Sequence, residues 1–411
     1  MNPARNLMDW RHSLFKHASI VPLIGGETIA QSQVFGSDPE YLLSYEAFSN
    51  NDQHCHNHIP VPYILLDKGG THPYHVDVVN TVCPCAGLSS LSPSANSDAA
   101  ANDWMTTTAE YVLGNMKPKV FWGENAPRLA SKMGAPVVEK LHEIGKKHGY
   151  SLTIYKTKSI LHGLSQVRDR TFYFFFEGYK VPVLKDYIRQ HTPIEDAIRS
   201  VKFDPTDKMS VVTNNRIPSQ DPYYRYILEE IHGGITHQEF SNMITKTSEV
   251  LTYIEEQGHD YRRVGSWMGE HGYNNEVVKC ERRYKKLKDG FNIMRKGTTI
   301  PKDYIGAFVG HLPTQLTHPD EDRYITIREA MSIMKLPETF ELVGGVRNLN
   351  HICQNVPVTT AMDMATEVKA WLNGERDTID STDKVWVQQN GGGRHMMIEK
   401  REINSLEGFL L

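Results

Sequence analysis

The segment at residues 77–89 combines a buried strand pattern with a reactive side chain. It reads DVVNTVCPCAGLS: three valines predict a buried parallel strand, and Pro84 opens a loop of small residues that contains Cys85. Open α/β folds build their sites in the loops at the carboxyl ends of such strands. Cys85 is therefore a candidate nucleophile, whereas a lone cysteine taken by itself is more often a small packed side chain.

A carboxyl group follows the next strand pattern. Residues 120–122 predict a strand, and Glu124 and Asn125 come directly after it. Because the carboxyl ends of neighbouring parallel strands share one edge of a sheet, we expect Glu124 near Cys85. The structural alternative is that Glu124 caps the helix that follows.

Two arginines and a glutamine follow a later strand. In GLSQVRDR, the residues Gln166, Arg168 and Arg170 occupy alternate positions. Side chains alternate between the two faces of an extended segment, so these three share one face. Two cationic groups on one face favour a carboxylate or an anionic partner, and a surface ladder of salt bridges is the alternative.

A glycine pair marks the first strand-to-helix turn. A short apolar strand is expected at residues 19–24, then Gly25 and Gly26, then a helix-like segment that starts at Glu27. Glycines at such a turn let the backbone approach a ligand and leave helix N–H groups available. Taken alone, the pair is non-specific and is more typical of an ordinary turn.

Acidic residues end the next two strand patterns. The strand YLLSYEAF ends at Glu46, where a Rossmann-like unit can place a carboxylate on a ribose. Asp67 follows the strand pattern VPYILL. A solvated surface residue is the alternative for Glu46.

These motifs, with RYITIRE at 323–329, follow one another in an order that resembles the DNA cytosine-5 methyltransferase family. The resemblance extends from about residue 19 to about residue 372 and leaves most of 190–310 unmatched. It implies a Rossmann-like α/β fold and S-adenosylmethionine as the methyl donor. The family has an aromatic residue and a glycine where this chain has Val21 and Leu23.

The resemblance also implies catalytic roles. Cys85, presented by Pro84, would add to carbon 6 of cytosine. Glu124 would contact the ring nitrogen and the exocyclic amine, Arg170 the cytosine oxygen, and Arg168 would hold Glu124 and the active-site loop.

Two further sets of site residues are expected. The cofactor would be bound by Gly25, Gly26, Glu46, Asp67, Pro84 and Asn355. The substrate or the DNA around it would be contacted by Ser89, Asn125, Gln166, Lys279, Arg282, Arg283 and Lys286. Arg328 and Glu329 are expected to serve the scaffold, in a helix that packs back on the catalytic domain.

The segment at 261–302 is locally basic although the chain has a formal charge of −4. It contains eleven Lys or Arg against four Asp or Glu, an excess that is typical of a surface that docks phosphates. Apolar spacing in 239–258 and the glycine-bounded segments after it predict three helices, the last at 274–288. We expect a helix-turn-helix-like unit whose last helix lies nearest the major groove, and a solvated basic face is the alternative.

Length and composition predict a soluble protein with more than one core. A chain of 411 residues with 39% hydrophobic and 23% charged residues fits one large domain with a smaller one. No apolar run approaches the ~18 residues of a membrane span. Five cysteines do not suggest a disulfide framework, and HCHNH at 54–58 is expected to be a polar loop and not a metal site.

The expected fold is a Rossmann-like methyltransferase sheet with an inserted, mainly helical target-recognition domain. Residues 1–190 would form the catalytic domain, 191–315 the insert with its helix-turn-helix-like part at 237–290, and 316–373 the return segment. The tail at 374–411 has no assigned role and would be a hairpin or mobile.

The expected function is methyl transfer to carbon 5 of cytosine in duplex DNA, with the base flipped out of the helix. We expect a monomer in the cytoplasm, or in a bacterial host's cytoplasm or nucleoid for a phage-type enzyme. The alternatives are a tRNA cytosine-5 methyltransferase and a catalytically silent DNA-binding protein with the same fold.

Overall fold

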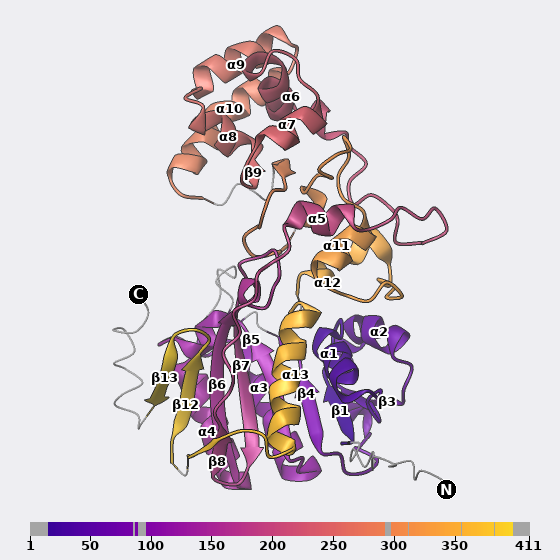
Figure 1. Ribbon diagram of the computed structural model, residues 1–411, viewed down its shortest axis with the longest axis vertical. Coiled ribbons are helices and arrows are strands. Elements are labelled where there is room, and N and C mark those ends of the chain that lie inside the picture. Colours follow the sequence, from indigo (N-terminus) through magenta and orange to yellow (C-terminus); the bar gives the residue numbers. More distant parts are fainter. Residues whose placement is uncertain are drawn as a thin grey trace, which may run out of the picture.

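The molecule is elongated, with a large sheet at one end and a helical unit at the other (Figure 1). A region of short helices and loops joins the two. This computed structural model describes residues 15–84, 87–88, 96–291, 297–310, 312–354, 356–381 and 383–397.

The sheet is mostly parallel. Its strands in chain order are β1 (His17–Ile20), β2 (Leu42–Ser44), β3 (Tyr63–Leu65), β4 (Val78–Thr81), β5 (Val120–Asn125), β6 (Tyr150–Lys158), β7 (Asp169–Glu177), β12 (Val385–Gln389) and β13 (Gly393–Met397). Within the described part of the chain they lie in the order β13-β12-β6-β7-β5-β4-β1-β2-β3. Strand β7 is antiparallel to β5 and β6, and β13 is antiparallel to β12; the other neighbours are parallel. The predicted α/β class is confirmed.

Each face of the sheet has its own hydrophobic core. Alternate residues point to opposite faces, so Val78 and Trp122 enter one core and Val79 and Phe121 the other. Helices α1 (Gly26–Phe35) and α13 (Val358–Leu372) pack together over the first face. Helices α3 (Ala100–Tyr111) and α4 (Ala135–His148) cover the second. Burial on both faces explains why the strands read as apolar runs in the sequence.

Several strand boundaries differ from the prediction. The first strand ends at Ile20 and not at residue 24, because Val21 and Leu23 have φ values of 52° and 51° and leave the extended conformation. The second ends at Ser44, and Glu46 begins a 3₁₀ helix. In contrast, β5 continues through Glu124 to Asn125 because both residues pair with β7.

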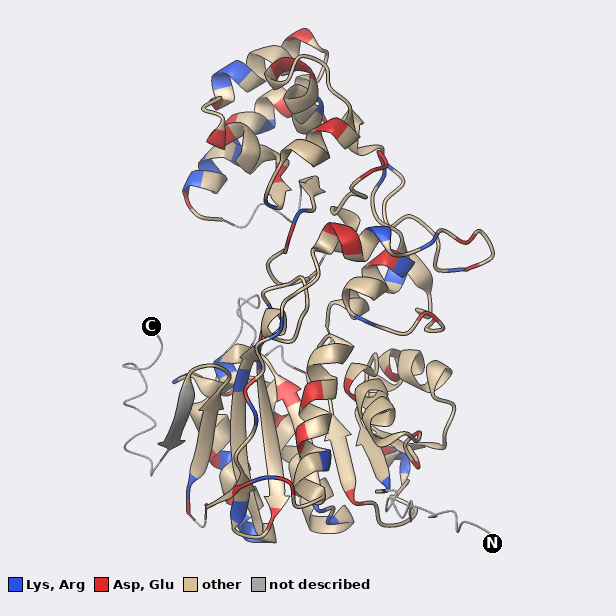
Figure 2. Cartoon of the chain, in the orientation of Figure 1, with Lys and Arg blue, Asp and Glu red and all other residues tan. Residues whose placement is uncertain are grey.

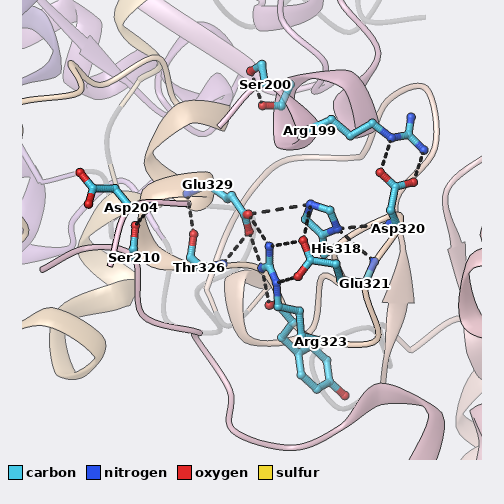
Figure 3. A network of polar contacts seen from close by, with 12 residues as sticks. Arg199, Ser200, Asp204, Ser210, His318, Asp320, Glu321, Arg323, Thr326 and Glu329 are labelled. Atoms are coloured by element: carbon cyan, nitrogen blue, oxygen red, sulfur yellow. Dashed lines mark hydrogen bonds and ion pairs between the residues drawn. The ribbon is translucent and has the colours of Figure 1, made fainter. Parts of the chain in front are cut away.

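Buried ion pairs hold the region between the sheet and the helical unit (Figure 3). The Arg323 guanidinium donates to both carboxylate oxygens of Glu329, at 2.9 and 2.8 Å, and Glu329 also completes the capping box of α11 (Ile327–Ile333) with Thr326. Arg328 donates to both oxygens of Asp207 at 2.7 and 2.9 Å. These contacts fit the scaffold role expected of Arg328 and Glu329, and α11 packs against α5 (Ile194–Arg199).

The helical unit has a hydrophobic core separate from both cores of the sheet. It comprises α6 (Pro222–Tyr226), a π-helix (Ile227–Ile231), α7 (His237–Met243), α8 (Val250–Glu256), α9 (Tyr261–Glu270) and α10 (Asn274–Lys288). The core extends from Tyr223 to Ile300, so it begins before residue 237, where the helix-turn-helix-like part was expected. The last predicted helix, 274–288, has the bounds of α10. The segment 239–258 is broken into α7 and α8 by the short strand β9 (Ser248–Glu249).

The chain returns to the sheet after α13. Strand β11 (Thr378–Asp380) pairs with β8 (Lys180–Pro182), and β12 then extends the sheet beside β6. The Asn390 side chain accepts from the Tyr187 N–H at 2.7 Å and donates to the Thr157 hydroxyl at 2.9 Å. The tail therefore contains a hairpin, one of its two expected forms.

The histidine-rich segment was predicted wrongly as a loop. It forms the end of α2 (Ser49–His58), where His54 and Cys55 are buried. The His54 Nδ1 accepts from the Val343 N–H at 3.1 Å, and its Nε2 lies 2.8 Å from the His351 Nδ1. These two contacts use both ring nitrogens of His54. Over the described residues there is no group of three or more metal-ligating side chains, and no helix there is long and apolar enough to span a membrane.

Candidate active site

Strands β5 and β7 bring the predicted catalytic residues Glu124 and Arg170 to one edge of the sheet. Pro84 follows β4, Glu124 lies at the end of β5, and Arg170 lies at the start of the antiparallel β7. Register pairs Asn125 with Thr171, so Arg170 lies immediately beyond the carboxyl end of β5. Cys85, Ser89 and Asn355 fall outside the described residues.

Glu124 and Arg170 form a buried ion pair. Only 1% of Glu124 is exposed, and its Oε2 lies 3.3 Å from the Arg170 Nε. Neither atom has a hydrogen-bond partner among the described residues. Buried polar atoms are nearly always hydrogen-bonded, so such a pair marks a place where another group can bind.

Burial controls the protonation of Glu124. Desolvation raises the pKa of its carboxyl, and the charges of Arg170 and Arg168 oppose that rise. A carboxyl whose pKa is raised can donate a proton at a higher pH than an ordinary one. The geometry therefore places a carboxyl with a raised pKa beside one fixed cation in a buried site.

Arg168 binds the return segment. Its guanidinium donates to the carbonyl oxygens of Phe308 at 2.8 Å and Cys353 at 2.7 Å, and 1% of the residue is exposed. Its charge still lowers the pKa of Glu124. Arg168 thus joins the sheet to two segments that are distant in sequence, while Arg170 makes the ion pair with Glu124.

Gln166 and Asn125 are also bound to the backbone around them. The Gln166 Oε1 accepts from the Phe308 N–H at 3.3 Å, and its Nε2 donates to the Met334 sulfur at 3.4 Å. The Asn125 Oδ1 accepts from the Ala126 N–H at 2.8 Å and shapes the turn after β5. Their expected contacts with the substrate stay predictions.

Four of the predicted cofactor residues, Gly25, Gly26, Glu46 and Asp67, lie at the carboxyl ends of β1, β2 and β3, which are adjacent strands. Gly25 has φ 94° at the start of α1, and a side chain there would meet the Cys55 sulfur at 2.6 Å. Both Asp67 oxygens accept from the Glu46 N–H at 3.0 Å. Both carboxylates are exposed, and Glu46 pairs with Lys68. A glycine turn flanked by accessible carboxylates fits a ligand that carries hydroxyl and amine donors.

Asp52 supports the glycine loop, and no sequence pattern predicted this role. The buried carboxylate accepts from the Leu23 N–H and the Tyr63 hydroxyl, each at 2.8 Å. Burial raises its pKa to about 6. It holds Leu23 in the left-handed region that a glycine would adopt freely. Asp52 lies in a polar stretch, so no hydrophobic pattern predicted its burial.

A second missed residue is Glu27 in the first turn of α1. It is fully buried beside the glycine loop. Glu27 and Gln31 are polar residues four positions apart in a helix that is otherwise largely apolar on its inner face. This spacing was the available signal, because it puts both side chains on one face.

The four basic residues among the predicted DNA contacts lie on α10, on the helical unit (Figures 1 and 2). Lys279 and Arg283 pair with Glu276 at 3.1 and 2.7 Å. Arg282 and Lys286 are exposed and have no ion-pair partner in the described part of the chain. Of these four cations, two are therefore unpaired within the described part of the chain and two are partly neutralised.

A family model supports the motif order. The model described as C-5 cytosine-specific DNA methylase matches residues 47–370. A Methanocaldococcus jannaschii protein named as a type II methyltransferase is 23% identical over 301 residues, which are 72% of this chain. The matched region spans 65% of that relative's length.

Solved structures support the fold. An Escherichia coli protein described as a DNA modification methyltransferase encoded within a prophage has a TM-score of 0.55 at 14% identity, over 87% of this chain and 99% of its own. The Entamoeba histolytica methyltransferase EhMeth has a TM-score of 0.50 at 12% identity, over 87% of this chain and 98% of its own. At these identities the likeness concerns the fold alone.

Proposed function

The chain belongs to the C-5 cytosine-specific DNA methylase family, and we propose that it methylates carbon 5 of cytosine in duplex DNA. The observation that carries the proposal is the buried pair of Glu124 and Arg170, whose facing atoms have no hydrogen-bond partner among the described residues. Glu124 is a potential proton donor and Arg170 is a cation. The polar edge of a pyrimidine carries a nitrogen and an oxygen that could accept from these two groups.

The proposed reaction uses a thiolate because carbon 5 of cytosine is a weak nucleophile. Cys85 adds to carbon 6, and Glu124 gives its proton to the ring nitrogen as electrons move into the ring. Arg170 donates to the carbonyl oxygen of cytosine and stabilises the charge that develops there. After methylation, loss of the carbon 5 proton and of the Cys85 thiolate restores the aromatic ring, and the ring nitrogen returns its proton to Glu124.

S-adenosylmethionine is the proposed cofactor and supplies an electrophilic methyl group when bound. Gly25 and Gly26 would hold it at the turn after β1. Glu46 and Asp67 would accept hydrogen bonds from its hydroxyl and amine groups, and Glu46 would have to exchange its Lys68 partner for them. The Pro84 and Asn355 contacts are carried over from the family pattern.

Duplex DNA is the proposed substrate. The exposed cations of α10 and the extra core of the helical unit support a separate recognition element. The reacting carbons are inaccessible in a stacked duplex, so the base must be flipped out, at a cost of about a few kcal/mol. Phosphate contacts and the bonds to Glu124 and Arg170 would offset that cost.

The test is covalent trapping. A fluorine at carbon 5 of the target cytosine blocks loss of the carbon 5 substituent, so the enzyme should stay bound to 5-fluorocytosine DNA as an adduct that survives denaturation. Cys85→Ala should form no adduct. Cys83→Ala, which removes a neighbouring buried thiol, should still form one.

The same assay separates the alternatives. An adduct on tRNA and none on duplex DNA would assign the chain to tRNA. Failure of the folded wild type to react with either substrate, at saturating cofactor, would overturn the proposal and favour a silent DNA-binding protein. Sequencing of methylated cytosines in cells that express the chain would then report the target sequence.

A further inference from the structure

A polar cavity of about 380 Å³ lies beside the ion pair of Glu124 and Arg170. Its lining includes the end of β6, the start of β7 and the end of β12. Strands β6 and β12 point the same way as β5, and β7 points the other way, so these ends lie at the edge of the sheet that carries Glu124. Arg170 lines the cavity and also pairs with Glu124. The cavity and the candidate active site therefore share one side chain.

Cations outnumber carboxylates in the lining of this cavity. It contains Lys156, Lys158 and Arg170 against one carboxylate, Asp169, which lies 3.8 Å from the Lys158 Nζ. Lys156 is half-buried, and its ammonium has no ion pair or hydrogen bond within the described part of the chain. Desolvation lowers the pKa of Lys156, although the Asp169 charge acts in the opposite direction. Burying a charge without a partner is costly, so a lone cation in a cavity marks a place where an anion can bind.

Lys156 belongs to a row of side chains that crosses the sheet. Register pairs it with Gln389 on β12 and with Thr171 on β7, and it pairs Thr171 with Asn125 on β5. Residues paired in this way project to the same face, on strands about 5 Å apart. Gln389 is exposed beside the ammonium, and the buried Asn125 Nδ2 has no hydrogen-bond partner among the described residues. Donors therefore extend from the cavity to the residue that follows Glu124.

We propose that this cavity binds a phosphate of the DNA strand that carries the target cytosine, with Lys156 as its cation and Gln389 as a neighbouring donor. A phosphodiester is an anion whose oxygens only accept hydrogen bonds, which fits a lining rich in cations and donors. The assignment rests on the proposed function, because the strand would bring a phosphate here when its base lies at Glu124 and Arg170. It gives the C-terminal hairpin of β12 and β13 a part in substrate binding.

The salt dependence of DNA binding by the full chain tests the site. Phosphate contacts carry no sequence information, so a fluorescent duplex oligonucleotide of mixed sequence serves as the probe. Lys156→Gln should weaken binding and reduce the slope of log K against log salt by about 0.9, because one cation that neutralises a phosphate is lost. Lys156→Arg retains the cation and should keep the wild-type slope. An unchanged slope in Lys156→Gln would overturn the proposal.

Lys180 provides the matched control. It is an exposed lysine on β8, which follows the end of β7 and so lies at the opposite edge of the sheet. Lys180→Gln makes the same chemical change and should keep the wild-type slope. A reduction in Lys180→Gln equal to that in Lys156→Gln would mean that the slope reports only the net charge of the chain, which would refute the cavity as the site.

Two further measurements separate binding from packing. A half-buried cation without a partner does not stabilise the fold, so Lys156→Gln should keep or raise the wild-type Tm. Gln389→Ala removes an uncharged donor, so it should weaken DNA binding about threefold and leave the slope unchanged. A lower Tm in Lys156→Gln, with weaker binding at the wild-type slope, would reduce Lys156 to a packing residue. Wild-type affinity in Gln389→Ala would exclude the hairpin from the site.

Inorganic phosphate distinguishes the two sources of the same anion. Thermal unfolding in sodium phosphate is compared with unfolding in sodium chloride at equal ionic strength. A phosphate that is held as part of a strand depends on the other contacts of that strand, so inorganic phosphate should change the Tm of the wild type and of Lys156→Gln equally. A Tm rise that requires Lys156, together with an unchanged slope for DNA, would assign the cavity to free phosphate and overturn the proposal.

Methyl transfer to plasmid DNA keeps this inference apart from the proposed function. Lys156→Gln should raise the KM for DNA about tenfold and leave kcat near the wild-type value, because the phosphate contact is the same before and during the reaction. A reduced salt slope in a chain that transfers no methyl group would support the phosphate site and refute the proposed function. Methyl transfer by the wild type with an unchanged slope in Lys156→Gln would support the function and refute the inference.

Discussion

Val21 and Leu23 adopt a backbone conformation that glycine adopts freely and that other residues adopt at a cost of about 1 kcal/mol or more each. The surrounding structure must hold them there. The Leu23 N–H is fixed by Asp52, and the Val21 N–H by the Leu43 carbonyl. This loop, in which Leu23 stands where the family has a glycine, therefore depends on the buried carboxylate of Asp52. The dependence can be measured.

Asp52→Asn should be as stable as the wild type at pH 7 or more stable. Because the carboxyl pKa is raised to about 6, its contribution to the free energy of unfolding is complete below the unfolded-state pKa, near 4, and is lost as the pH rises through 6. The free energy of unfolding falls by about 3 kcal/mol for a pKa shift of about two units. Asn retains an acceptor for Leu23 without this loss, so urea unfolding should become less pH-dependent between pH 4 and 7.

Asp52→Ala is the contrasting variant. It leaves the Leu23 N–H and the Tyr63 hydroxyl buried without an acceptor, at about 1 to 3 kcal/mol each. It should be less stable than Asp52→Asn at every pH. Equal stability of the two variants would show that the hydrogen bonds do not hold the loop.

Arg170→Met should destabilise the protein at pH 8 more than at pH 5. Removing the cation raises the pKa of the buried Glu124 further, so stability is lost as pH rises through that value. An uncompensated buried charge costs about 3 kcal/mol. The cost is smaller at pH 5, because protonation of the carboxyl removes the buried charge as the pH falls. Denaturant unfolding at the two pH values measures the difference.

The double variant Arg170→Met with Glu124→Gln provides the control for this prediction. It contains neither charge, so its stability should depend less on pH than that of Arg170→Met. If both variants lost the same stability between pH 5 and pH 8, the effect would lie outside the Glu124 carboxyl.

Elements with strong periodicity or clear ends could be predicted from the sequence. Helix α10 was predicted with its observed bounds because glycine turns lie at both of its ends. Helix α2 was missed because its histidines and asparagines lack an apolar stripe, and its burial comes from contacts with residues 340–351. Alternation placed Arg168 and Arg170 on one face but could not show that segments far along the chain would occupy Arg168. Local sequence patterns predict local structure, whereas contacts between residues far apart in the sequence determine the features that were not predicted.

Asn390→Ala tests whether the C-terminal hairpin is part of the folded core. The side chain satisfies the buried Tyr187 N–H and bonds the Thr157 hydroxyl. Its loss should cost about 2 to 4 kcal/mol, from two buried groups left without this partner. Gln389→Ala, an exposed neighbour, should change stability by less than about 0.5 kcal/mol. Equal thermal shifts for the two variants would mean that the hairpin does not contribute to the core.

At the scale of the whole molecule, the separate core of the helical unit changes how the unit should be removed. A deletion of 236–296 would leave Tyr223, Tyr224, Tyr226 and Ile227 without the side chains that cover them. A deletion from about residue 221 to about residue 300 removes the core intact. Cofactor binding by the remaining sheet, measured by calorimetry, should survive the second deletion better than the first.

DNA affinity should depend on the exposed cations of α10 according to their pairing within the protein. A cation that neutralises a phosphate releases a counterion, so Arg282→Ala and Lys286→Ala should each weaken binding and reduce the slope of log K against log salt by about 0.9. Lys279 and Arg283 share the Glu276 carboxylate, so Lys279→Ala should reduce the slope less.

The slopes come from fluorescence anisotropy with a duplex oligonucleotide between low and physiological salt. Lys208, an exposed cation paired with Glu341 outside the helical unit, provides the matched control, and Lys208→Ala should keep the wild-type slope. If Arg282→Ala and Lys286→Ala also kept that slope, α10 would not face the phosphates, and the basic segment would be a solvated surface.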